Sequence, residues 1–179
     1  MFMKLLEKRR SIRKFSDKAV EQEKVQTLIE AALRSPSGRG TNPWEFVVVD
    51  DREMLAKLST AKKAGAAFLK GAALGIVVCV NPDSSDTAVE DASIASIIIQ
   101  LAAESIGLGS CWIQMRNRRH SDGRPAQEHI AQLLNLPASY MVQSVVALGY
   151  PAETKAPHSR ESLQFDKIHL GRFGQRMSS

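Results

Sequence analysis

The chain has 179 residues, of which 44% are hydrophobic and 24% charged, and its formal net charge is +5 at pH 7. This composition is typical of a folded soluble protein, and the length fits one domain with its own core or one half of a tight dimer. The positive charge gathers at residues 8–14 and 116–124. Two separate clusters fit a small anionic ligand at least as well as a nucleic acid.

The first half of the chain predicts alternating helices and strands, because apolar residues recur first at helical spacing and then in short continuous runs. The run at 44–49 is broken only by Glu45, which predicts a strand buried on both faces. In chain order we expect helices over 1–10 and 21–33, a loop over 35–40, a strand over 44–49, a helix that Asp50 and Asp51 can cap, a short helix or close-packed turn over 64–73, and a strand over 74–80.

The second half is organised around a predicted helix over 86–106 that is apolar on nearly every side. Such a helix must be buried on nearly every side, which indicates a central helix or one packed against a second subunit. Next we expect a short strand or extended loop over 110–115, an exposed basic stretch over 116–124, a helix over 127–134 and a strand over 142–148. Strands alternate with helices, so the class is α/β or α+β.

The tail after Pro151 has little periodicity but carries apolar residues, and such a tail stays ordered only where it packs on something. We therefore expect it to wrap a partner surface. The apolar residues are Leu163, Phe165, Ile168, Leu170 and Phe173.

The two cysteines, Cys79 and Cys111, lie in apolar runs and form no CxxC pair, which favours buried thiols over a disulfide framework or a zinc site. The N-terminus lacks the apolar core of a signal peptide, and no run reaches the length of a membrane span. We therefore expect a cytoplasmic protein that binds no membrane.

The most concentrated polar chemistry lies in Arg9-Arg10-Ser11-Ile12-Arg13-Lys14-Phe15. A guanidinium donates two parallel hydrogen bonds to a phosphate, so these arginines and the hydroxyl can hold one. The alternative is a solvated basic helix end, which composition alone favours. The sequence contains no Walker, GxGxxG, HExxH or GxSxG motif, and no acid/base dyad. Its histidines lack metal-ligand spacing, so we expect no metal site; they are His120, His129, His158 and His169.

Four segments in this order resemble the FMN-dependent nitroreductase family, over about residues 5–170. They are the 9–15 cluster, then Ser35-Pro36-Ser37 with Asn42-Pro43-Trp44-Glu45-Phe46, then Asp91-Ala92-Ser93-Ile94-Ala95 running into Gly107-Leu108-Gly109-Ser110-Cys111-Trp112-Ile113, and last Ala147-Leu148-Gly149-Tyr150-Pro151. The resemblance implies an α+β fold with a central mixed sheet flanked by helices. It also implies one domain over 1–179 and an intertwined homodimer, with about 150–179 domain-swapped onto the partner and two FMN sites at the interface.

The resemblance assigns roles to individual residues. Arg9 matches the phosphate-binding arginine, and Arg10 and Ser11 match residues along the ribityl chain and the pyrimidine edge. Arg13 matches a cation near N1 and O2 that tunes the flavin. The remaining cofactor contacts are Pro36, Ser37 and Gly38 in the loop of the second subunit, Trp112, Ile113 and Gln114 over the ring, and Lys155 or, as the better candidate, Arg160 at the phosphate.

The sequence departs from many relatives at three positions. Gly40 lacks a side chain that can touch flavin, Asn42 stands in place of a longer Gln, and Met115 stands in place of a glycine. Few residues separate the strand at 74–80 from the helix at 86–106, so we expect an open site without a long lid.

The implied reaction is ping-pong, with NADH or NADPH reducing the flavin at N5 and a nitroaromatic, quinone or similar acceptor then reoxidising it. The flavin carries the chemistry, so no catalytic side chain is expected. One alternative is a flavin-binding dimer that acts as a sensor or partner-binding protein without useful turnover. Nucleic-acid binding through 116–124 is a further alternative, which no recognised motif accompanies, and we expect no nucleic-acid partner.

Overall fold

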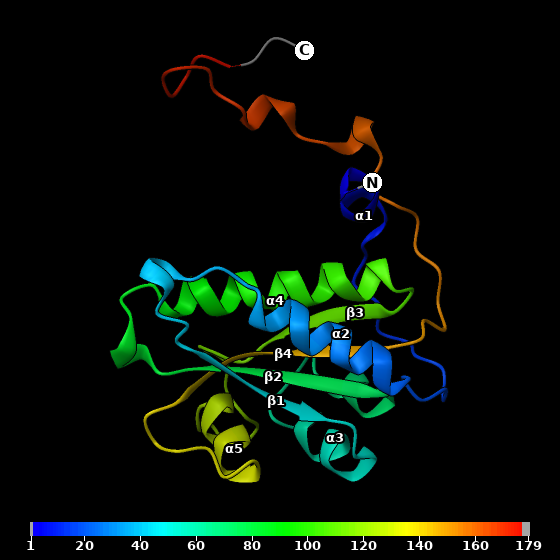
Figure 1. Cartoon of the computed structure of the whole chain (residues 1–179), viewed down its shortest axis with the longest axis vertical. Helices are drawn as coiled ribbons and strands as arrows, with labels where there is room; N and C mark the ends of the chain where they lie inside the picture. Colours follow the sequence, from blue (N-terminus) through cyan, green and yellow to red (C-terminus); the bar gives the residue numbers. More distant parts are fainter. Residues whose placement is uncertain (1, 177–179) are drawn as a thin grey trace.

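The computed structural model describes residues 2–176 and places a four-stranded sheet between two layers of helices (Figure 1). The strands are β1 (Trp44–Val49), β2 (Leu74–Val80), β3 (Gly109–Gln114) and β4 (Met141–Gly149), in the order β1-β2-β4-β3. All three strand pairs are antiparallel, and a parallel bridge joins Ser11 to Ser110 at the β3 edge. The expected α+β fold with a mixed sheet is confirmed.

Helices α2 and α4 cover one face of the sheet, and α3 and α5 cover the other (Figure 1). The predicted helix over 86–106 begins two residues later, after Thr87, and the predicted first helix stops at Lys8. The helices are α1 (Phe2–Lys8), α2 (Gln22–Leu33), α3 (Arg52–Leu58), α4 (Ala88–Ser105) and α5 (Ala126–Leu133). Within residues 2–176, no helix is long and apolar enough to cross a membrane.

Strand β2 lies at the centre of the core and is buried along its whole length. Because successive side chains of a strand point to opposite faces, Ile76 and Val78 pack toward α2 and α4, whereas Val77 and Cys79 pack toward α3 and α5. The continuous apolar run that predicted this strand therefore reflects two separate core layers.

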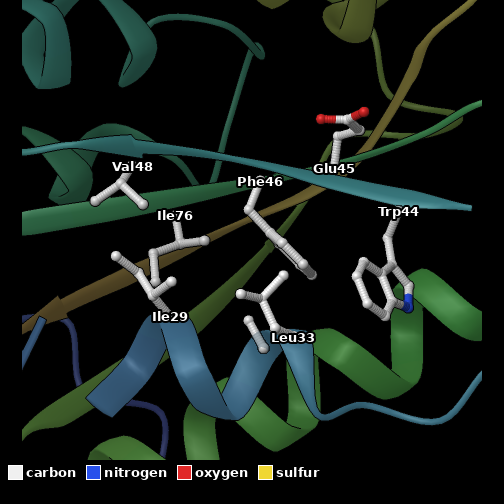
Figure 2. Close-up of a pocket in the computed structure, with 8 residues that line it drawn as sticks. Ile29, Leu33, Trp44, Glu45, Phe46, Val48 and Ile76 are labelled. Carbon is white, nitrogen blue, oxygen red and sulfur yellow. The ribbon is translucent and has the colours of Figure 1, made fainter. Parts of the chain in front are cut away.

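Strand β1 is an edge strand, so the prediction that residues 44–49 are buried on both faces is wrong for the single chain. Glu45 and Val48 are exposed, and β2 is the only strand paired with β1 in the described residues. Figure 2 shows Trp44, Phe46 and Val48 pointing toward α2, while Glu45 points to the opposite face. One face of β1 thus borders an apolar groove, whereas on the other face Val49 is buried and Val47 is partly buried.

Within the single chain, helix α4 is buried on its sheet side but not all round, so it is not the central helix that was the first of the two alternatives. Ala92, Ala95 and Ile99 are fully buried. Ile94 and Ile97 remain 38% and 37% exposed. An uncovered apolar stripe on an otherwise packed helix favours the second alternative from the sequence, a helix that packs against another subunit.

Four side chains near the end of β4 join α2 to the end of α4. The Lys24 ammonium donates to the Ile106 carbonyl (2.8 Å) and to the Tyr150 hydroxyl (2.9 Å). That hydroxyl donates to the Glu21 carboxylate (2.7 Å), which also pairs with Lys18 at 2.8 Å. Hydrogen bonds from Lys18 and then Tyr150 lower the pKa of Glu21 to about 2.

This network predicts a pH-dependent contribution to stability. The folded pKa of Glu21 lies below its ordinary value of 4.5, so the contribution is complete above about pH 4.5 and is lost as the pH falls through about 2. Glu21→Gln should therefore lower Tm slightly at neutral pH, and the gap to the wild type should close in acid. Glu23→Gln, on the same helix, is the control in thermal melts across this range. Equal acid dependence in the wild type and Glu21→Gln would contradict the prediction.

Candidate functional site

The segment 9–15 leaves α1 and runs along the edge formed by β3 and the end of β4. The backbone N–H of Ile12 donates to the Ser110 carbonyl (2.9 Å), and Phe15 forms a bridge with Pro151. Gly109 permits this approach, because a Cβ there would lie 3.0 Å from the Ile12 side chain. We call residues 9–15 the anchor segment, since it brings the basic cluster of the sequence onto the sheet.

The cations of the anchor segment are held mainly through backbone contacts. Arg10 donates through its guanidinium to the Ala156 carbonyl. The Glu153 carboxylate accepts from the backbone N–H of Arg13 (2.5 Å) and of Lys14 (3.2 Å), which lowers the pKa of Glu153. Within residues 2–176 no carboxylate lies within 4.0 Å of the guanidinium of Arg9 or Arg13. Both groups therefore keep their capacity to bind an anion.

The two tail residues expected at the phosphate lie in different surroundings. The Lys155 ammonium donates to the Ser11 carbonyl, so it lies beside the anchor segment of its own chain. Arg160 belongs to the part of the tail that extends past α1 away from the sheet (Figure 1), where its guanidinium lies 5.3 Å from the Phe165 ring centre. In the single chain, the geometry brings Lys155 rather than Arg160 to the anchor segment.

The end of β3 provides a sheet edge with no partner strand. Beyond the bridge at Ser110, the described residues pair with β3 only on its β4 side. The Trp112 indole N–H donates to the Gln114 side-chain carbonyl (3.0 Å), and the Gln114 amide donates to the backbone carbonyl of Arg116 (3.0 Å). These contacts fix Trp112 and Gln114, while Ile113 is buried in the core.

Both cysteines are buried, as the sequence predicts. Burial raises the pKa of Cys79 to about 12 and also raises the pKa of Cys111, although the charge of Arg13 opposes the latter shift. A thiol that stays protonated is a poor nucleophile, which favours packing over redox chemistry.

The loop of Pro36, Ser37 and Gly38 is fixed to the first turn of α4. The Gly38 N–H donates to the buried Asp91 carboxylate (3.0 Å), which also accepts from the Thr87 hydroxyl (3.0 Å). A Cβ at Gly38 would lie 2.2 Å from that hydroxyl oxygen, so the position requires glycine.

Asn42, one of the three departures from the family pattern, bonds Ser37 in two ways. Its backbone N–H donates to the Ser37 hydroxyl (2.9 Å), and its side-chain carbonyl accepts from that hydroxyl (2.8 Å). Of the other two, Gly40 adopts a positive φ of 67° and Met115 is fully buried.

This loop and the anchor segment lie at opposite ends of α4 (Figure 1). Gly38 bonds Asp91 in the first turn, whereas Ile12 packs on Gly109 after the last turn. At 1.5 Å per residue, α4 separates the two by about 25 Å. One chain alone therefore does not bring the two parts of the expected site together.

The basic stretch 116–124 is partly neutralised within its own turn. Arg119 donates to the Gly123 carbonyl (2.7 Å), and Arg124 pairs with Asp122 (2.7 Å). His120 stacks on His129 with ring centres 4.4 Å apart, an arrangement that the scattered histidines of the sequence did not suggest. Across residues 2–176 no cluster of three or more possible metal ligands occurs.

The model of the nitroreductase family matches residues 6–150 of this chain. The chain belongs to the nitroreductase family. Among solved structures, an FMN-dependent nitroreductase from Clostridium difficile superposes with a TM-score of 0.94 at 44% identity, covering 96% of this chain and 99% of that one. A nitroreductase with bound FMN from Desulfitobacterium hafniense gives a TM-score of 0.74 at 25% identity, covering 96% and 98%.

Two curated proteins match most of this chain but different shares of their own lengths. A protein from Archaeoglobus fulgidus with the provisional name NADH dehydrogenase/NAD(P)H nitroreductase is 37% identical over 172 residues, which is 93% of this chain and 95% of that one. An FMN reductase [NAD(P)H] from Bacillus subtilis is 27% identical over 179 residues, which is 88% of this chain and 69% of that one.

Two residues beside this candidate site were not predicted from the sequence. Glu153 orients the anchor segment from the start of the tail, and Lys62 donates from its ammonium to the Gln114 carbonyl (3.2 Å). Each contact joins a side chain to a backbone group far away in the chain. Neither has a motif, so only the folded geometry identifies them.

The close contact at Gly109 predicts that Gly109→Ala destabilises the protein by about 1–3 kcal/mol, since the added Cβ overpacks against the stiff, β-branched Ile12. Urea unfolding measures the change. Gly71→Ala is the matched control, because no atom lies within 4 Å of a Cβ at Gly71. Equal stability of both variants and the wild type would show that the anchor segment does not press on β3.

Proposed function

We propose that this protein is an FMN-dependent NAD(P)H oxidoreductase that reduces a nitroaromatic, quinone or similar acceptor in a ping-pong sequence. One observation carries the proposal: the anchor segment places Arg9, Ser11 and Arg13 beside the unpaired edge of β3. Membership of the nitroreductase family and the FMN and NAD(P)H in the names of its relatives support it.

The residues present fit a flavin nucleotide. Arg9 offers donors to a doubly charged phosphate, and within residues 2–176 no carboxylate neutralises Arg9 or Arg13. Lys155 adds a cation at Ser11, although it also pairs with Glu153 at 3.5 Å. The free backbone edge of β3 from Trp112 to Gln114 offers N–H and C=O groups to a planar ring. We assign the remaining contacts to Arg10, Ser11 and the loop 36–38.

Bound FMN supplies the redox chemistry, accepting a hydride from NADH or NADPH and passing electrons to the acceptor. The protein contributes binding and electrostatics. Arg13 would lie on the ring side of the bound cofactor, and its permanent positive charge would favour the reduced state. The buried Cys111 takes no part, because burial raises its pKa and keeps the thiol protonated.

The two separated parts of the site support a homodimer. Because α4 holds the loop 36–38 and the anchor segment about 25 Å apart, a complete site requires the loop of a second chain. An exposed apolar face is available for that contact. It combines α1 with the outer stripe of α4 and consists of Phe2, Met3, Leu6, Ile94 and Ile97.

A groove beside β1 is the candidate binding site for the tail of the second chain. Its volume is about 300 Å³, and Figure 2 shows Ile29 and Leu33 of α2 facing Phe46 and Val48 of β1 across it. The outer edge of β1, on the side away from β2, has no partner strand in the described residues, so it can also pair with an extended segment. The tail carries exposed apolar side chains that suit the mainly apolar lining of this groove, at Leu163, Phe165, Ile168, Leu170 and Phe173.

The cofactor assignment predicts different effects for two arginine variants. Purified protein should absorb near about 450 and 370 nm and oxidise NAD(P)H when a nitroaromatic or quinone is added. Arg9→Ala should weaken FMN binding by about ten- to a hundredfold, because a charge-assisted hydrogen bond is lost. Arg13→Ala should instead lower the flavin potential and slow its reduction, as measured by redox titration and stopped-flow absorbance.

Arg34→Ala, which removes an exposed cation at the end of α2, is the control for these variants. A colourless protein that FMN does not reconstitute would overturn the proposal. A yellow protein without acceptor-dependent NAD(P)H oxidation would favour the flavin-binding sensor instead. Equal loss of FMN from Arg9→Ala and Arg13→Ala would contradict their separate roles.

The interface assignment predicts that Ile97→Asp converts a dimer into a monomer, because it buries a charge in an apolar contact. Light scattering after size exclusion measures the mass, and the monomer should retain little FMN. Ala56→Asp, on the exposed side of α3, should remain dimeric. In the wild-type dimer, amide exchange at 163–170 should be slow. A monomeric wild type, or a tail that exchanges as fast as an unfolded peptide, would contradict the arrangement.

A further inference from the structure

Lys62 is a half-buried cation at the open end of β3 that the expected FMN contacts do not use. It follows α3, and its ammonium donates to the Gln114 carbonyl (3.2 Å). An ammonium has three donors, and this is the single hydrogen bond that Lys62 makes through its side chain within residues 2–176. No carboxylate of that range lies within 4.0 Å of it. A neutral amide would suffice to tie the loop to β3, so the charge itself requires an explanation.

The surroundings of Lys62 are positive. The Lys63 backbone N–H donates to the Arg119 carbonyl (3.1 Å), so the loop that carries Lys62 lies beside residues 118–119. Burial and then the charge of Arg118 lower the pKa of Lys62. Burial raises the pKa of Cys111, three residues before Gln114 on β3, and the positive charges of Arg13, Lys155 and Lys62 oppose that rise. The carboxylate of Glu153 accepts from backbone N–H groups of the anchor segment and lies 3.5 Å from the Lys155 ammonium, so it pairs with Lys155 and not with Lys62. Lys62 is therefore a partly desolvated cation without a counter-ion in the described residues, which indicates a place where an anion binds.

Lys62 and the anchor segment lie at different points along β3. Ser11 bridges to Ser110 at the start of the strand, whereas Lys62 reaches Gln114 at its end. Four residues of strand separate these points by about 14 Å. A phosphate held at the anchor segment therefore leaves the charge of Lys62 available to a second anionic group. Arg118 is exposed, so the second group can enter from solvent.

We propose that Lys62, assisted by Arg118, forms an anion-binding subsite that takes the carboxylate of an aromatic acceptor. This inference rests on the proposed function, since the acceptor must lie against the flavin at the end of β3. It narrows the acceptors to anionic nitroaromatics or quinones. A phosphate of NADPH offers similar chemistry, and the experiment must separate the two sources.

The test compares 4-nitrobenzoate with its neutral methyl ester. Dissociation constants are measured without reductant, from the change in flavin absorbance of the oxidised holoenzyme. Lys62→Met should weaken binding of 4-nitrobenzoate about tenfold and leave the ester unchanged. Lys62→Arg should restore binding to within about threefold, because it keeps the charge. Lys63→Met, at the exposed neighbouring lysine, should match the wild type.

Arg118→Met should have a smaller effect, about threefold on 4-nitrobenzoate, because its side chain is exposed and its charge is better screened. Equal weakening of the acid and the ester by Lys62→Met would overturn the subsite and assign Lys62 a structural role. The subsite would also be overturned if Lys62→Met raised KM for NADPH but not for NADH and left the binding of 4-nitrobenzoate unchanged. In both cases the holoenzyme stays yellow and active, which distinguishes this failure from failure of the proposed function.

Discussion

The close approach of the anchor segment to two glycines is the constraint on which the site depends. A Cβ at Gly109 would meet Ile12 at 3.0 Å, and one at Gly149 would meet Phe15 at 3.1 Å. These glycines face each other as a residue pair, Gly109 at the start of β3 and Gly149 at the end of β4. They let a segment from the start of the chain lie against the sheet as a partial fifth strand. Because the backbone is fixed there, the positions from which the side chains of Arg9, Arg10 and Arg13 extend are fixed as well.

The charge balance of the site follows from the same backbone placement. Glu153 is bound by two N–H groups of the anchor segment rather than by a guanidinium. The nearest carboxylate is thus used to hold the chain in position, and Arg13 keeps its charge for a ligand. The result is a site that is positive although the segment that carries it has an acidic neighbour.

The sequence predicts most of this fold because its patterns are strong where an element is buried. The continuous run of β2 and the apolar periodicity of α4 give both elements to within two residues. The run at 44–49 looks equally buried, but β1 is at the edge, since strand order depends on which strands pair rather than on composition. Whether two strands run parallel or antiparallel also depends on how the strands pair in the folded chain, so the sequence pattern does not predict it.

The site itself was predictable only in part. The order of the segments leads us to propose residues 9–13 and 112–114 as site residues. The contacts of Lys62 and Glu153 span 52 and 139 residues along the chain and leave no local pattern.

The placement of two half-sites at opposite ends of α4 has a genetic consequence. In the proposed homodimer, twofold symmetry gives each site the anchor segment of one chain and the loop of the other. A chain defective at Arg13 and a chain defective at Gly38 would therefore form a mixed dimer with one intact site, while the other site would contain both defects. Two inactive alleles expressed together would restore function through intragenic complementation, with half of the sites in each mixed dimer active.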